Sequence, residues 1–151
     1  MSAPTREDLK QRIRDYMATY TNIGTDVTDA DVGMMAFPAY EVEIFGTTRR
    51  RSGKRNVSTY TVRVYIYGCI ARDVTDDAKW RADRATAEAF IDPIADFIAD
   101  NPTLKLATGS PVNLVANDSD MVVNDQGVGL LNINKKAYAG FALEFQVTIG
   151  R

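Results

Sequence analysis

Hydrophobic and polar residues follow a helical spacing in the first part of the chain. Apolar side chains recur there at steps of four and three residues, which predicts an amphipathic helix over about residues 6–20. Thr5 followed by Asp8 resembles a capping box with Asp in place of Glu, so it marks the start of this helix. The apolar residues of the pattern are Leu9, Ile13, Met17 and Tyr20.

The alternation changes to a period of two from Tyr40 onward, which is typical of strands. Residues 40–46 and 57–67 both show it, and we expect them to pair as an antiparallel hairpin, with Ser52 and Gly53 supplying the turn. Five cations without any acidic residue occupy residues 46–56, so they are expected at or near the tip of this hairpin arm, about 40–67. These cations are Arg49, Arg50, Arg51, Lys54 and Arg55.

A second helix is predicted over residues 76–100, after a cap at Thr75 and with Asp76 and Asp77 in its first turn. Pro93 lacks a backbone N–H group and is expected to kink the helix near residue 90. An apolar stripe should bury this helix against the sheet. The stripe consists of Trp80, Ala87, Ile91, Ile94 and Ile98.

The C-terminal part again favours strands. Short apolar runs occupy residues 112–115, 121–123 and 128–133, and a clear alternation over 141–149 predicts a last strand with one buried face. The order of elements predicts one α+β domain over residues 1–151, with an antiparallel or mixed sheet and two helices packed on one face.

Two further groups are candidates for subunit contacts. Met34, Met35 and Phe37 are too apolar for an exposed linker, so they either cover the core or contact another subunit. Glu41 and Glu43 lie on the polar face of a predicted strand, where they are either solvated or part of a subunit contact.

The charge is divided unevenly along the chain. The formal net charge of the 151 residues is -2, so the five cations of residues 46–56 leave a charge of -7 on the remainder. With a sequence pI of about 5.1, the chain is not a general DNA-coating protein, and a contact with phosphate would be confined to the basic segment. That segment is a solvated tip, or it binds an anionic surface that relieves the repulsion between its like charges.

Residues suited to catalysis are scarce. The chain has no histidine, which excludes the commonest general base and most zinc sites, and its single cysteine, Cys69, is expected to be packing. Asp118, Asp120 and Asp125 lack the spacing of an EF-hand. We therefore expect a protein without enzymatic activity, cofactor or metal, and without a signal peptide or membrane span.

The length, the order of elements, the basic hairpin and the segment "YIYGCIARDVTDDAKWRADRATAEAFIDPI" together resemble the tail terminator, or tail-completion, proteins of long-tailed bacteriophages. The resemblance extends from the Leu9 helix to the strand ending at Ile149 and includes no catalytic motif. It implies a virion protein, assembled in the host cytoplasm, that forms a ring, typically a hexamer. Such a ring caps the tail tube, halts its growth and binds the head connector, and DNA passes through its centre.

The basic arm departs from this pattern, because five cations facing a DNA channel would hold the DNA rather than let it slide. We expect the arm to contact an acidic protein surface in the neck or tail, with DNA as the second candidate. The alternative identities are another neck or adaptor protein and a small DNA-binding module that inserts a basic β-ribbon into a groove, although the acidic body argues against the latter.

Overall fold

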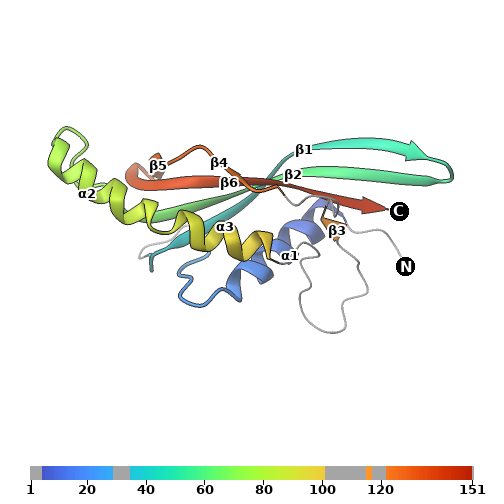
Figure 1. The fold of residues 1–151 in the computed structure, drawn as a ribbon, viewed down its shortest axis with the longest axis horizontal. Helices are drawn as coiled ribbons and strands as arrows, with labels where there is room; N and C mark the ends of the chain where they lie inside the picture. Colours follow the sequence, from blue (N-terminus) through green and yellow to red (C-terminus); the bar gives the residue numbers. More distant parts are fainter. Residues whose placement is uncertain (1–4, 29–34, 101–114, 117–121, 151) are drawn as a thin grey trace.

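The computed structural model describes residues 5–28, 35–100, 115–116 and 122–150, and shows the predicted α+β architecture (Figure 1). Three helices accompany a mostly antiparallel sheet. The helices are α1 (Arg6–Ala18), α2 (Asp77–Glu88) and α3 (Ile91–Ala99). The strands are β1 (Ala39–Ser52), β2 (Arg55–Ile70), β3 (Val115–Ala116), β4 (Asn124–Asp125), β5 (Gly129–Ile133) and β6 (Lys136–Gly150).

The sheet is built on two long central strands, β2 and β6. Their neighbours follow the order β1-β2-β6-β3, and β4 and β5 also pair with β6 on the side away from β2. The predicted pairing of residues 40–46 with residues 57–67 is present, and it continues to the pair Ser52 and Arg55. Because β6 ends opposite Val57, the turn end of the β1–β2 hairpin extends past β6 (Figure 1).

The strands are longer than the sequence predicts. The sequence predicts strands only over residues 40–46 and 57–67, but β1 continues to Ser52 and β2 begins at Arg55. Gly53, with a φ of 62°, and Lys54 make up the whole turn. Arginine side chains are compatible with an exposed strand edge, so the charge of the segment does not end the ladder.

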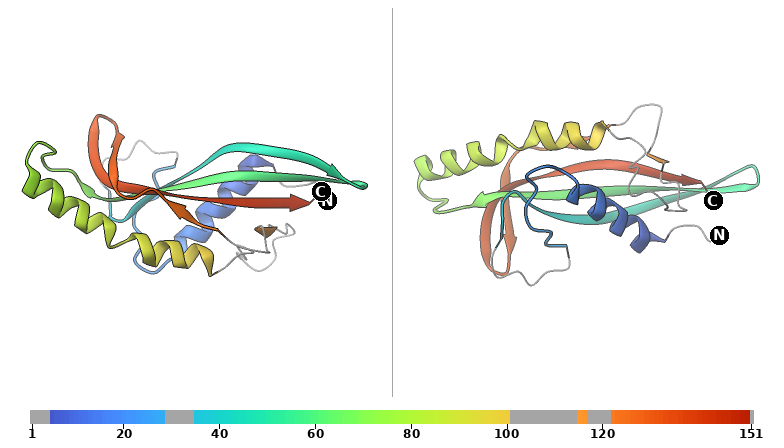
Figure 2. Two further views of the ribbon diagram at one scale, coloured as in Figure 1. Left: turned by 45° about the horizontal axis from the view of Figure 1, so that its top comes forward. Right: turned by 90° about the horizontal axis from the view of Figure 1, so that it is seen from below.

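All helices lie on one face of the sheet, which confirms the predicted layering with a third helix added (Figure 2). Tyr16 of α1 stacks on Phe97 of α3 with ring centroids 4.5 Å apart, and its hydroxyl donates to the Phe97 carbonyl oxygen. The buried core between helices and sheet combines Leu9, Ile13, Met17, Tyr40, Val42, Tyr60, Val62, Val64, Ile66, Ile94, Ile98, Phe141, Leu143, Phe145 and Val147.

The first helix forms as its sequence predicts. The Thr5 hydroxyl accepts from the Asp8 backbone N–H (3.2 Å), and the Asp8 carboxylate accepts from the Thr5 N–H (2.8 Å), so both halves of the capping box are made. These bonds lower the pKa of Asp8 below its usual range. The helix ends at Ala18, two residues before the predicted boundary.

The predicted helix over 76–100 is two helices. α2 ends at Glu88, Ala89 and Phe90 form a turn, and α3 begins at Ile91. Pro93 occupies the first turn of α3, where its missing N–H group costs nothing because that donor would have no intrahelical partner. The break near residue 90 was therefore predicted, but its extent was not.

Two details of α2 correct the sequence interpretation. Its N-cap is Asp76, whose carboxylate accepts from the N–H groups of Ala78 and Lys79, whereas Thr75 donates its hydroxyl to Asp73. Trp80 is only partly buried, because the first half of α2 extends beyond the end of the sheet (Figure 1).

A smaller apolar cluster lies at one end of the sheet, around Tyr67 and Tyr138. Met35 and Phe37 pack against it, and the Phe37 ring lies 6.0 Å from that of Tyr138. The two residues therefore cover apolar surface of their own chain, which is one of the two expected roles, while Met34 lies outside the described residues.

The remaining strand predictions have mixed outcomes. The run over 128–133 forms β5, and the alternation over 141–149 is part of β6. Of the other two runs, the described residues include only Val115 of 112–115, but two of the three residues of 121–123. The longest described helix has 13 residues, and none of the described helices is long and apolar enough to cross a membrane.

Candidate partner-binding surface

A β-bulge at Phe45 decides where the cations of β1 point. The pairing shifts between Ile44, opposite Val62, and Gly46, opposite Thr61. One extra residue on β1 exchanges the two faces for everything that follows it. Arg49 and Arg51 consequently lie on the face that carries the buried core residues, and Arg50 lies on the other.

The cations gather at the turn end of the hairpin. Arg49 lies opposite Ser58, Arg50 opposite Val57 and Arg51 opposite Asn56. We call Arg49, Arg50, Arg51 and Lys54 the basic hairpin end. All four side chains are exposed. Arg55 begins β2 at the same end, where its backbone pairs with Ser52.

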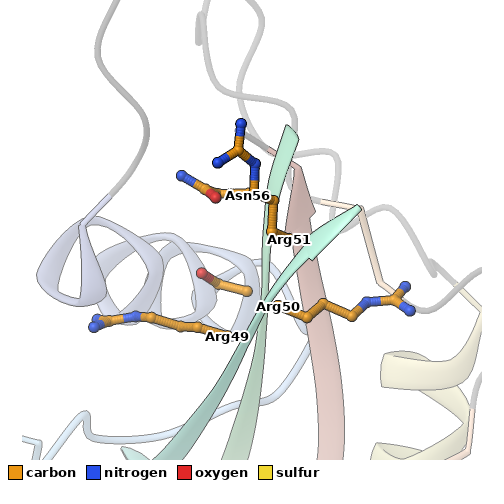
Figure 3. A pocket seen from close by; sticks show the side chains of 5 residues that line it. Arg49, Arg50, Arg51 and Asn56 are labelled. Atoms are coloured by element: carbon orange, nitrogen blue, oxygen red, sulfur yellow. The ribbon is translucent and has the colours of Figure 1, made fainter. Parts of the chain in front are cut away.

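Within the described part of the chain, no carboxylate pairs with the basic hairpin end. Its one side-chain hydrogen bond runs from Arg51 Nε to the Gly53 carbonyl oxygen (3.2 Å). Arg49 and Arg50 extend in opposite directions from β1, and Arg51 lies beside Asn56 (Figure 3). Together with Ser58 these residues line an open hollow of about 450 Å³. Among the described residues, the guanidinium groups of Arg49 and Arg50 therefore have no carboxylate partner, and they are open to a molecule that approaches this end.

Arg6 is a residue of this region that the sequence did not indicate. Arg6 is the first residue of α1. Its Nη2 donates to Thr47 Oγ1 of β1 (2.9 Å), which lies 41 positions further along the chain. The contact fastens the N-terminal end of α1 to the hairpin and adds another exposed cation near the basic hairpin end. No local pattern links residues so far apart, so only the tertiary fold reveals it.

The face of the sheet opposite the helices carries a row of charged and aromatic side chains. Arg63 donates from Nε to Glu144 Oε1 (2.9 Å), and its guanidinium carbon lies 4.0 Å from the centroid of the Phe45 ring. Phe45 is 47% exposed and Glu43, opposite Arg63, is also exposed. This row is accessible to a partner, yet its central cation is already neutralised.

Glu41 and Glu43, both expected on the polar face, have different environments. The Glu41 carboxylate accepts from the Tyr67 hydroxyl (2.9 Å) and is half-buried. Burial raises the pKa of Glu41, and the hydrogen bond opposes this rise only in part. Glu41 is thus committed to a contact within the chain, and Glu43 is the better placed of the two for an external contact.

The single cysteine lies where α2 packs on β2. The Cys69 thiol is half-buried and donates to the Asp83 carbonyl oxygen (3.4 Å). Burial raises the pKa of this thiol, and the nearby negative charge of Asp83 raises it further. Asp83 is itself buried and accepts from Arg72 through both the backbone N–H (3.0 Å) and Nε (2.9 Å). At neutral pH Cys69 is a thiol rather than a thiolate, which makes it a weak nucleophile.

The three aspartates that lack the EF-hand spacing lie only partly within the described residues. Asp118 and Asp120 lie outside the described residues, and the Asp125 carboxylate accepts from the Gly127 N–H (2.9 Å). Among the residues that the structure does describe, no three acidic or cysteine side chains gather closely enough to hold a metal ion.

No model of a protein family matches the chain, and no curated protein sequence is significantly similar to it. The function must therefore be argued from the residues and their arrangement.

Proposed function

We propose that the protein is a structural virion protein that forms a ring, with six copies, at the end of a phage tail tube and joins the tube to the head. The observation that carries the proposal is the basic hairpin end. It extends past β6, and its cations have no acidic partner among the described residues. An anionic partner outside the chain would neutralise the positive charges of such a surface.

The position of β1 supports the same proposal. It is an edge strand, and apart from an isolated bridge between Asp26 and Tyr40 its outer edge has no backbone partner among the described residues. Unpaired strand edges are sites at which other chains add to a sheet. An edge strand that ends in a basic tip therefore suits contact with a neighbouring subunit or a stacked ring.

Two alternative functions would also use the basic hairpin end. Another protein of the neck, such as an adaptor between head and tail, would use the same hairpin in the same way. A small DNA-binding module is favoured by one observation, namely that the cations project from two faces of a β-ribbon. Against it, the rest of the chain carries a charge of -7, which repels a DNA backbone.

A gene deletion tests the proposal against both alternatives. Without a terminator, tails are expected to lack a defined length and to remain separate from filled heads in electron micrographs, and the wild-type chain supplied in trans should restore joined particles. Separate heads with tails of normal length would favour an adaptor, and normal joined particles would contradict the proposal.

A further inference from the structure

Three aspartates form an exposed line along α3 and its C-cap. Asp92, Asp96 and Asp100 are four residues apart, so they follow one another along a single face of the helix. We call them the acidic stripe. No hydrogen bond or salt bridge from their carboxylates to another described residue is present, and all three are exposed.

The acidic stripe faces away from the sheet of its own chain. Ile94 and Ile98, on the other side of α3, are buried in the core between the helix and the sheet. The turn end of the hairpin lies beyond the end of β6 and away from α3 (Figures 1 and 2). Among the described residues, no salt bridge joins its cations to the acidic stripe, so the two surfaces of opposite charge are available for a contact between copies.

We propose that the basic hairpin end of one copy binds the acidic stripe of a second copy. The spacings agree. Arg49 and Arg51 project from the same face of β1, about 6.8 Å apart along the strand. Successive carboxylates of the acidic stripe are about 6 Å apart along the helix. Two arginines on one strand face can thus contact two consecutive aspartates.

This contact joins different surfaces of the two copies, so it is head-to-tail. Repetition of such a contact produces a closed ring or an open filament, depending on the rotation between copies. The inference rests on the proposed ring, because it names the surfaces by which neighbouring subunits of that ring bind each other. Its test uses the isolated protein and requires no virus particle.

The experiment uses charge reversal in the full chain. In a hairpin variant, Arg49, Arg50 and Arg51 are replaced by glutamate. In a stripe variant, Asp92, Asp96 and Asp100 are replaced by arginine. A control for the hairpin variant changes exposed cations elsewhere by the same total charge, through the substitutions Arg81→Glu, Lys135→Glu and Lys136→Glu. Circular dichroism and thermal unfolding establish that each variant is folded.

Self-association is measured by sedimentation equilibrium at protein concentrations approaching millimolar, in about 10 mM salt, where the Debye length is roughly 30 Å. The wild-type chain should associate. The hairpin and stripe variants should each lose about tenfold or more in association constant, since several ion pairs turn repulsive together, and the control should lose much less. An equimolar mixture of the hairpin and stripe variants should associate again, because each supplies the charge that the other lacks.

Three results would overturn the inference: a monomeric wild-type chain under these conditions, a control as weakened as the hairpin variant, or a mixture that fails to associate. If the wild-type chain binds duplex DNA and the mixed variants do not associate, the partner of the hairpin is nucleic acid instead. Restored association in the mixture, combined with particles that lack the chain, would contradict the proposed virion function while leaving this contact in place.

Discussion

Gly68 on β2 and Ala87 on α2 are in such close contact that a Cβ atom added to Gly68 would lie 2.7 Å from both Cα and Cβ of Ala87. The absent side chain is what lets α2 approach the sheet at this point. Both residues are buried. The position of α2, and with it the salt bridge between Asp83 and Arg72, depends on this approach.

The substitution Gly68→Ala should therefore lower the free energy of unfolding by roughly 1–3 kcal/mol, the usual cost of an overpacked contact. Chemical denaturation measures it. Gly46→Ala is the matched control, because a Cβ atom at Gly46 meets no atom within 4 Å. Equal losses for the two variants would show that Gly68 matters through its backbone freedom rather than through the approach of α2.

The substitution Ile94→Ala tests the packing of α3. The side chain is fully buried between helix and sheet, so its truncation should cost roughly 2–5 kcal/mol in the free energy of unfolding. Asp96→Ala, two residues along the same helix but exposed, should change that free energy by less than about 0.5 kcal/mol. A loss below about 0.5 kcal/mol for Ile94→Ala would contradict the packing described here.

Asp26 should make stability depend on pH. Its carboxylate accepts from Arg14 Nε (2.8 Å) and from the N–H (2.9 Å) and hydroxyl (2.6 Å) of Thr28. Burial would raise the pKa of Asp26, but these hydrogen bonds outweigh burial and lower it. The stabilisation is thus present above the unfolded pKa of about 3.9 and is lost as the pH falls through the lower folded value.

We expect Asp26→Asn to reduce the free energy of unfolding at pH 7 by roughly 1.5–3 kcal/mol, the contribution of hydrogen bonds to a charged group. The difference from wild type should shrink as the pH falls below about 3.9. Urea denaturation across this pH range measures it. A difference that stays constant from pH 7 downward would show that the Asp26 charge does not contribute.

DNA binding gives a further prediction. Five neutralised phosphates would produce a slope of about -4.5 in a log-log plot of affinity against salt concentration. If the cations contact protein, the wild-type chain should bind duplex DNA only weakly, and replacing Arg49, Arg50, Arg51, Lys54 and Arg55 by glutamate should prevent joining of tails to heads. A slope near -4.5 would favour the DNA-binding alternative, and normal joining by the variant would leave the cations as a solvated tip.

Local signals account for the parts of the fold that the sequence predicts well. The capping box at Thr5 and the period-two run ending at Ile149 depend on neighbouring residues, and both elements form, although their boundaries differ from the prediction by up to five residues. The bulge at Phe45 depends instead on how two strands pair, and nothing in the alternation of β1 indicates it. Trp80 is buried less fully than predicted for a similar reason, since an apolar stripe along one continuous helix does not show where the sheet beneath it ends.

The candidate partner-binding surface, too, is only partly predictable from the sequence. The cluster of cations is visible in the sequence, because five of them occur without an acidic neighbour. Their distribution over two faces of β1 follows from the bulge, and the contribution of Arg6 follows from a contact between residues 41 positions apart. The sequence therefore shows which cations cluster along the chain, while their arrangement in space follows only from the fold.

The most direct measurement for the proposed function is a cryo-electron micrograph reconstruction of intact particles assembled from the genome that encodes this chain. We predict a ring of this protein between the tail tube and the head, with the basic hairpin end of each subunit against a protein surface. Density for the chain elsewhere in the particle, or its absence from the particle, would contradict the proposal.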